Sequence, residues 1–219
     1  MTPLDPDRIL ALSYVPARRR AAVEALWRLD AALGAALGGG SEPLIARIKL
    51  AWWCEALEKL DREKAPAEPT LQALAEHVVP TVSGADLAGL EEGWSVLTGQ
   101  DPLSSDDLDL YAGRGRLLFR FSAALLGDGP GVEVERAGEV WALVDLARHS
   151  GAPDAASALD AARRRLPAAG KGRWPARLRP LGMLHALARR DAARGLQPME
   201  PQGSPKRMAR MLRHRFTGR

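Results

Sequence analysis

Apolar side chains recur at spacings of three and four throughout residues 18–61, and this pattern restricts the stretch to helices. Residues spaced in this way share one face of an α-helix, so each run predicts a helix with one buried side. A glycine-rich turn at 38–40 separates two runs, and Ser41 is expected to cap the second helix. The expected buried residues are Val23, Leu26, Leu29, Leu33 and Leu37 in the first run and Ile45, Ile48, Trp52, Ala56 and Leu60 in the second.

Similar helical patterns continue along the rest of the 219 residues. Alanine, leucine and arginine dominate, β-branched residues are few, and no alternating strand pattern occurs, so an all-α fold is expected. We expect one helical domain over 1–197, followed by a Pro-rich spacer and a basic amphipathic helix over 198–219. Further helices are expected after Asp5 and over 71–79, 83–97, 106–126, 132–149, 154–166 and 181–195.

The composition says more about the compartment in which the protein resides than about the reaction it could catalyse. The formal net charge of +4 is small, so the charge of the whole molecule is a weak guide to partners. Cys54 is the single cysteine, which rules out an internal disulfide and favours a reducing compartment. Charged residues interrupt the first ten positions, so no signal peptide is predicted, and no apolar run is long enough for a membrane span. We expect a cytoplasmic protein, with peripheral attachment to the inner membrane as a further hypothesis.

Several segments together resemble the squalene/phytoene synthase family. Arg47 to Leu57, with the pair Trp52-Trp53, resembles the family's tryptophan-bearing helix, and we expect this pair to anchor the core. Residues 111–127 resemble its glycine-bearing helix, and residues 179–195 resemble its closing core helix. The resemblance covers nearly the whole chain and implies a single bundle of the isoprenoid synthase type. Glycines at positions 113 and 115 each cost a helix about 1 kcal/mol, which predicts close approach of a backbone or ligand there.

The same resemblance implies the chemistry to look for. Enzymes of this family join two prenyl diphosphates head to head, and Mg²⁺ ions link the diphosphates to aspartate-rich motifs on two facing helices. Magnesium requires oxygen ligands, and carboxylates one helical turn apart can reach the same metal cluster. In this chain the first motif would fall on residues 34–38, which contain no carboxylate, while Asp30 lies one turn early. In the second motif Asp145 takes the Asn position, Arg148 the Arg position and His149 an Asp position.

These departures predict a family member without metal-dependent catalysis, for which no cofactor is expected. Such a protein would keep an apolar pocket and bind an isoprenoid or another lipid. It is similar to the family branch that includes a respiratory complex I assembly factor, which implies a respiratory-complex subunit as a partner. The residues implied for substrate binding are Arg18, Trp52, Tyr111, Arg114 and Arg148. The alternative is an active prenyltransferase with Mg²⁺ on Asp30 and Asp145 as residual catalytic and metal-binding residues. A third alternative is a helical scaffold without a pocket.

Two groups of arginines allow more than one interpretation. The run Arg18–Arg20 is either a solvated surface or a contact for a diphosphate, as the resemblance implies for basic residues there. Arg114, Arg116 and Arg120 are either surface charge or a means of neutralising an anionic headgroup or diphosphate without metal.

The basic tail, residues 206–219, contains no acidic residue. Met208, Met211, Leu212 and Phe216 can share one face of a helix with arginines beside it. This pattern suits an anionic membrane surface or an acidic partner, and equally a helix that docks on its own domain. Nucleic-acid binding is not expected, because no recognition motif accompanies the charge.

Other reactive side chains are expected to be structural. The four histidines show no metal-binding spacing, and His185 is expected to be a satisfied core or boundary residue. Cys54 has no nearby histidine and is expected to be an inert thiol. Asp106, Asp107 and Asp109 lie where a helix begins, so they complement the helix dipole and need no metal.

Overall fold

The computed structural model describes residues 3–38, 42–99, 102–129, 131–166, 172–195 and 198–219. These residues form helices and no strand, which confirms the all-α prediction. The helices are α1 (Pro6–Ser13), α2 (Ala17–Ala36), α3 (Pro43–Lys59), α4 (Pro69–His77), α5 (Gly84–Ala88), α6 (Leu90–Ser95), α7 (Ser105–Leu125), α8 (Val132–His149), α9 (Asp154–Arg165), α10 (Arg179–Arg194) and α11 (Pro205–Thr217), with 3₁₀ turns η1 (Val96–Thr98) and η3 (Ala176–Leu178).

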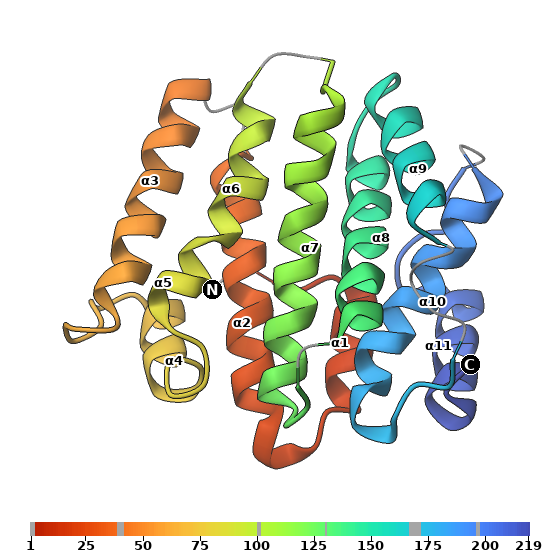
Figure 1. Cartoon of the computed structure of the whole chain (residues 1–219), viewed down its shortest axis with the longest axis horizontal. Helices are drawn as coiled ribbons and strands as arrows, with labels where there is room; N and C mark the ends of the chain where they lie inside the picture. Colours follow the sequence, from red (N-terminus) through yellow and green to blue (C-terminus); the bar gives the residue numbers. More distant parts are fainter. Residues whose placement is uncertain (1–2, 39–41, 100–101, 130, 167–171, 196–197) are drawn as a thin grey trace.

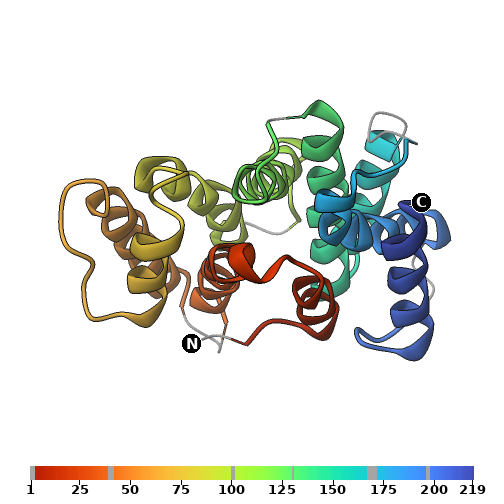
Figure 2. The same cartoon turned by 90° about the horizontal axis from the view of Figure 1, so that it is seen from below.

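The long helices stand side by side, with α3 at one end of the molecule and α9 to α11 at the other (Figure 1). Seen from below, α2 and α1 lie on one side of α7 and α8 (Figure 2). The most extensive helix–helix contact joins α7 to α8. These two helices therefore form the centre on which the other helices pack.

Local sequence signals explain where the central helices begin and how closely they pack. Ser104 and Asp107 form a reciprocal capping box at the start of α7. A Cβ atom on Gly115 would lie 2.2 Å from the carbonyl oxygen of Gly138 in α8. The predicted close approach is thus confirmed at Gly115, whereas a Cβ on Gly113 would meet only the end of the Arg116 side chain at 3.7 Å.

The predicted helix boundaries agree with the structure except in one stretch. The expected helix over 83–97 divides into α5, α6 and η1, with Gly89 between the first two. The 39–40 part of the glycine-rich turn and Ser41 lie outside the described residues. Glu42 precedes α3 as its N-cap residue and makes no side-chain capping bond.

The expectation that Trp52 and Trp53 anchor the core is wrong. Trp52 is 47% exposed and Trp53 is half-buried, while Ile45 and Ile48 also face outward. Ala56 and Leu60 are buried as expected, but Ala46, Leu50 and Leu57 take the place of Ile45, Ile48 and Trp52 in the buried face of α3, which packs against α5, α6 and α2. The prediction failed because this helix is apolar on nearly every side, so spacing alone did not define the face that packs.

Helix α11 lies against α10 and α1. Met211 and His214 are buried there, and Arg207 forms ion pairs across both contacts. Met208 and Phe216 remain exposed, so the four apolar residues of the tail do not share one environment. In the part of the chain that the structure describes, no helix combines the length and the apolar character that crossing a bilayer requires.

Candidate functional site

Four charged side chains meet inside the bundle and form what we call the central charge cluster: Arg8, Asp30, Arg114 and Asp145. They come from α1, α2, α7 and α8 respectively. The side chains of Asp30 and Arg114 are fully buried, and those of Arg8 and Asp145 are nearly so. Burial of this much charge destabilises a fold unless each charge has a partner. The geometry of the ion pairs therefore decides whether the cluster can be stable.

Arg114 bridges the two carboxylates. Its Nη1 donates to Asp30 Oδ1 at 3.1 Å, and its Nη2 donates to Asp145 Oδ2 at 3.1 Å. Arg8 donates from Nη1 to the other oxygen of Asp30 at 2.9 Å, and the indole N–H of Trp94 donates to Asp30 Oδ1 at 3.1 Å. The two positive and two negative charges balance within this cluster.

Aromatic rings enclose the guanidinium of Arg114. Its central carbon lies 4.1 Å from the ring centroid of Trp94 and 4.5 Å from that of Tyr111. Trp141 lies on another side, at 5.2 Å from the same carbon, and also contacts Arg8. Cation–π attraction of this kind strengthens when water is excluded, so the rings help to hold the buried arginine in place.

The electrostatic effects of the cluster are consistent with this pairing. Burial acts to raise the pKa of Asp145, but Arg114 and Arg8 outweigh it and hold the pKa below its usual value. Burial acts to lower the pKa of Arg114, yet Asp30, Tyr111 and Asp145 raise it overall. Burial raises the pKa of Tyr111, which is therefore a neutral phenol at physiological pH. Arg114 and Asp145 are thus ionised and paired rather than poised for proton transfer.

Magnesium, which the family resemblance implies, does not fit this set of donors. Asp30 already accepts hydrogen bonds from Arg8, Arg114 and Trp94. Asp145 also accepts a hydrogen bond from Arg114. A dication would have to displace a guanidinium of the same sign from between the two carboxylates. Among the residues that the structure describes, no group of three His, Cys, Asp or Glu side chains is arranged to hold a metal ion.

A cavity of about 480 Å³, which we call the central cavity, opens beside the cluster. Its size falls within the range of ordinary small-molecule sites. Apolar and aromatic residues provide much of its wall, and Arg8, Asp145 and His149 provide charge or polarity. Its lining consists of Pro3, Leu4, Asp5, Arg8, Ala31, Gly34, Leu37, Gly38, Trp94, Leu97, Tyr111, Asp145, Leu146, His149, Ser150 and Gln202.

No protein-family profile, curated protein or solved structure matches this chain. The site therefore has to be interpreted from its own geometry.

The structure brings together some of the residues that the sequence singled out and separates others. Asp30, Tyr111, Arg114 and Asp145 meet at the central charge cluster. Arg18 is exposed in the first turn of α2, about 18 Å along the helix from Asp30. Trp52 lies on the outer face of α3, where it lines a separate surface hollow. Arg116 and Arg120 are exposed on α7, so the surface interpretation applies to them and not to Arg114.

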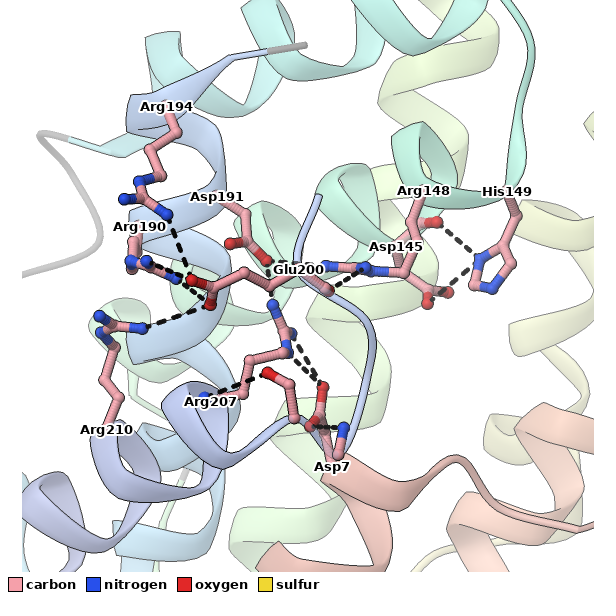
Figure 3. Close-up of polar contacts among 12 residues, drawn as sticks. Asp7, Asp145, Arg148, His149, Arg190, Asp191, Arg194, Glu200, Arg207 and Arg210 are labelled. Atoms are coloured by element: carbon pink, nitrogen blue, oxygen red, sulfur yellow. Dashed lines mark hydrogen bonds and ion pairs between the residues drawn. The ribbon is translucent and has the colours of Figure 1, made fainter. Parts of the chain in front are cut away.

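Arg148 belongs to a second ion-pair network, drawn in Figure 3. It donates to Asp191 at 2.9 Å and to the backbone carbonyl of Glu200 at 2.9 Å. Arg207 binds the same Asp191 at 2.6 Å and Asp7 at 2.8 Å. This network joins α1, α8, α10 and α11, so it fastens helices together and does not line the central cavity.

The sequence interpretation missed Arg8 and Trp94, both of which contact Asp30. Arg8 follows the cap of a short helix and resembles any solvated arginine in sequence. Trp94 lies 64 residues beyond Asp30, in a stretch that gives no signal beyond a helical pattern. Only the tertiary packing shows that both side chains turn inward.

Proposed function

We propose that this protein binds an isoprenoid or a similar apolar lipid in the central cavity and does not carry out metal-dependent prenyl transfer. It would be a noncatalytic relative of the squalene/phytoene synthases. The observation that carries the proposal is the position of Arg114, whose guanidinium stands between Asp30 and Asp145, the two residual carboxylates that an active prenyltransferase would have for magnesium.

The character of the cavity supports an apolar ligand. Leu37, Leu97 and Leu146 line it together with the rings of Trp94 and Tyr111. Transfer of an apolar chain from water to such a surface is favourable, by about 25 cal/mol for each Å² of apolar surface buried. The polar groups near the mouth, including His149 and Ser150, offer hydrogen-bond partners to a hydroxyl or headgroup.

Calorimetric titration with farnesol, with and without Mg²⁺, tests the proposal. We expect saturable binding that the metal does not alter. Leu97→Trp places a larger side chain in the cavity wall and is expected to abolish binding. Val96→Trp is the matched control, because Val96 lies in the same 3₁₀ turn, is half-buried like Leu97 and does not line the cavity.

The outcomes separate the competing functions. Absence of farnesol binding, or equal loss in both tryptophan variants, would contradict the proposed pocket and favour a helical scaffold. Release of pyrophosphate from farnesyl diphosphate in the presence of Mg²⁺ would instead support an active prenyltransferase. Thermal unfolding of each variant shows whether the altered side chain has disturbed the fold.

Attachment to an anionic membrane through residues 204–219 is part of the same proposal. Helix α11 keeps Met208 and Phe216 exposed beside basic side chains while its other face docks on the bundle. Apolar and basic groups on one exposed surface favour binding to anionic lipid. Attachment to the membrane surface would also suit a role in assembling a respiratory complex. A subunit of that complex would then be the protein partner.

A further inference from the structure

A second large cavity, of about 730 Å³, lies between α10 and α11, and we call it the basic pocket. It shares no lining residue with the central cavity, so an inference from it does not depend on lipid binding in that cavity. Arg189, Arg190, Arg210, Arg213 and Arg219 line it, and none of the described residues in its lining is acidic. Two histidines and an apolar wall that includes Leu166, Trp174, Ala186 and Ala193 complete it.

The positive charge of the basic pocket exceeds the negative charge that the protein supplies. Glu200 is the one carboxylate, among the described residues, within ion-pair distance of any of the five arginines. It binds Arg190 and also faces Arg194 at 3.3 Å and Arg210 at 3.9 Å, so one anion serves three cations (Figure 3). The hydrogen bonds from Arg190 lower the pKa of Glu200 to about 2.

Arg210 shows the consequence of this imbalance. Its Nη1 atom is buried and has no hydrogen-bond partner in the described part of the chain. Burial lowers the pKa of Arg210, and the neighbouring positive charge of Arg190 lowers it further. A buried donor without an acceptor costs free energy, which an anion in the pocket would recover.

His185 and His214 form the buried side of the basic pocket. Their side chains are only 2% and 3% exposed. Both rings line the basic pocket and flank Trp174, with ring centroids 6.0 and 6.2 Å from its own. Each ring also meets a backbone group, of Ala137 for His185 and of Arg219 for His214, so the rings shape the pocket and the arginines supply its charge.

The backbone makes room for this arrangement at Gly182. A Cβ atom there would lie 2.2 Å from Nε2 of His214 and 2.8 Å from the Trp174 ring. Only glycine therefore lets both rings lie against α10. Both histidines and four of the five arginines thus stand on α10 and α11, while Trp174 precedes η3 and is fixed by its backbone N–H, which donates to the Gly218 carbonyl oxygen at 3.0 Å.

We propose that the basic pocket binds an organic phosphate, with the phosphate group on the arginines and an apolar part against Trp174. Arginine pairs with phosphate through charge-assisted, often bidentate hydrogen bonds. The volume exceeds what a bare phosphate fills and suits a phosphate ester. The phosphate could belong to a soluble ester or to a lipid headgroup, and the chemistry of recognition is the same.

Two titrations of the full chain test the proposal and distinguish the two sources. The first uses inorganic phosphate and phenyl phosphate in solution, followed by calorimetry. The second uses phosphatidylcholine vesicles with and without phosphatidic acid, followed by co-sedimentation. Arg189→Gln and Arg213→Gln remove arginines that are exposed and have no ion-pair partner among the described residues, so the fold should be kept. Arg120→Gln, on the exposed surface of α7, is the control with the same change in net charge.

We expect wild-type protein to bind phenyl phosphate more tightly than inorganic phosphate, and each pocket variant to weaken binding by about tenfold or more. The ring resonances of His185 and His214 should shift on binding in NMR spectra. A response in the soluble titration identifies a soluble ester, and a response confined to vesicles with phosphatidic acid identifies a headgroup. Absence of saturable binding in both titrations, or equal weakening by Arg120→Gln, would overturn the proposal.

Discussion

Gly115 of α7 and Gly138 of α8 lie so close that a Cβ on either residue would stand about 2 Å from the carbonyl oxygen of the other. This approach allows α7 and α8 to make the most extensive contact in the bundle. It also sets Arg114, the neighbour of Gly115, at hydrogen-bonding distance from Asp145 on α8. The central charge cluster thus depends on two residues that have no side chain.

Gly115→Ala should destabilise the protein by about 2 kcal/mol, because the added methyl group would press against the Gly138 backbone and force the helices apart. Gly113→Ala is the matched control two residues away, where the space is open. That change should stabilise the protein by about 1 kcal/mol through helix propensity. Urea unfolding of both variants measures the difference, and equal effects would contradict the close packing.

Arg114→Met should destabilise the protein at pH 7 by roughly 3–5 kcal/mol, because it leaves buried carboxylates without their shared cation. The pKa of Asp145, which Arg114 holds down in the wild type, should then rise. Asp145 would bind a proton more readily in the folded variant than in the unfolded chain, so the loss of stability relative to the wild type should shrink as pH falls from 7 towards 5. Chemical unfolding of both proteins across this range provides the measurement. A difference that stays constant or grows on acidification would show that Arg114 does not neutralise Asp145.

The stability of the wild type should depend on pH through His185. Burial lowers the pKa of His185 to about 4 from an ordinary 6.5. Because the unfolded chain binds this proton first, stability is fully present above pH 6.5 and is lost as pH falls towards 4. The loss from this residue is about 3 kcal/mol. Burial lowers the pKa of His214 to about 4 as well. His185→Phe should therefore reduce the slope of unfolding free energy between these pH values without removing it, and an unchanged slope would contradict the buried, neutral state of the His185 ring.

Phe216→Ser should weaken binding of the protein to phosphatidylglycerol vesicles by roughly tenfold, because Phe216 is 72% exposed on α11 and can enter the interface. Val132→Ser is the control, since Val132 is just as exposed but begins α8, away from the basic tail. Vesicle co-sedimentation at low salt measures both variants. Equal binding by Phe216→Ser and wild-type protein would exclude α11 as the attachment surface.

Helix positions were the part of the fold that the sequence predicted well. The range 132–149 coincides with α8, and the capping serine and first-turn acids of 104–107 place the start of α7. These signals are local, since a cap or a periodic apolar face involves residues within one or two turns. Glycine within a helical pattern was informative as well, because its cost in a helix indicated the contact at Gly115.

The faces that pack and the partners of buried charges could not be predicted in the same way. Helix α3 is apolar on most sides, so only its place at the end of the bundle decides that Leu50 is buried and Trp52 is not. His185 was expected to be a core or boundary residue and is buried, but its place beside His214 and Trp174 in a pocket could not be predicted. Pairings of this kind depend on tertiary contacts between residues far apart in the chain.

The Arg114 guanidinium stands between Asp30 and Asp145, the two carboxylates with which an active prenyltransferase would have to hold Mg²⁺. Calorimetric titration of farnesyl diphosphate into the protein, in EDTA and in Mg²⁺, tests this claim most directly. The account predicts the same affinity in both solutions and no release of pyrophosphate. Binding that requires Mg²⁺, with pyrophosphate released into solution, would contradict it.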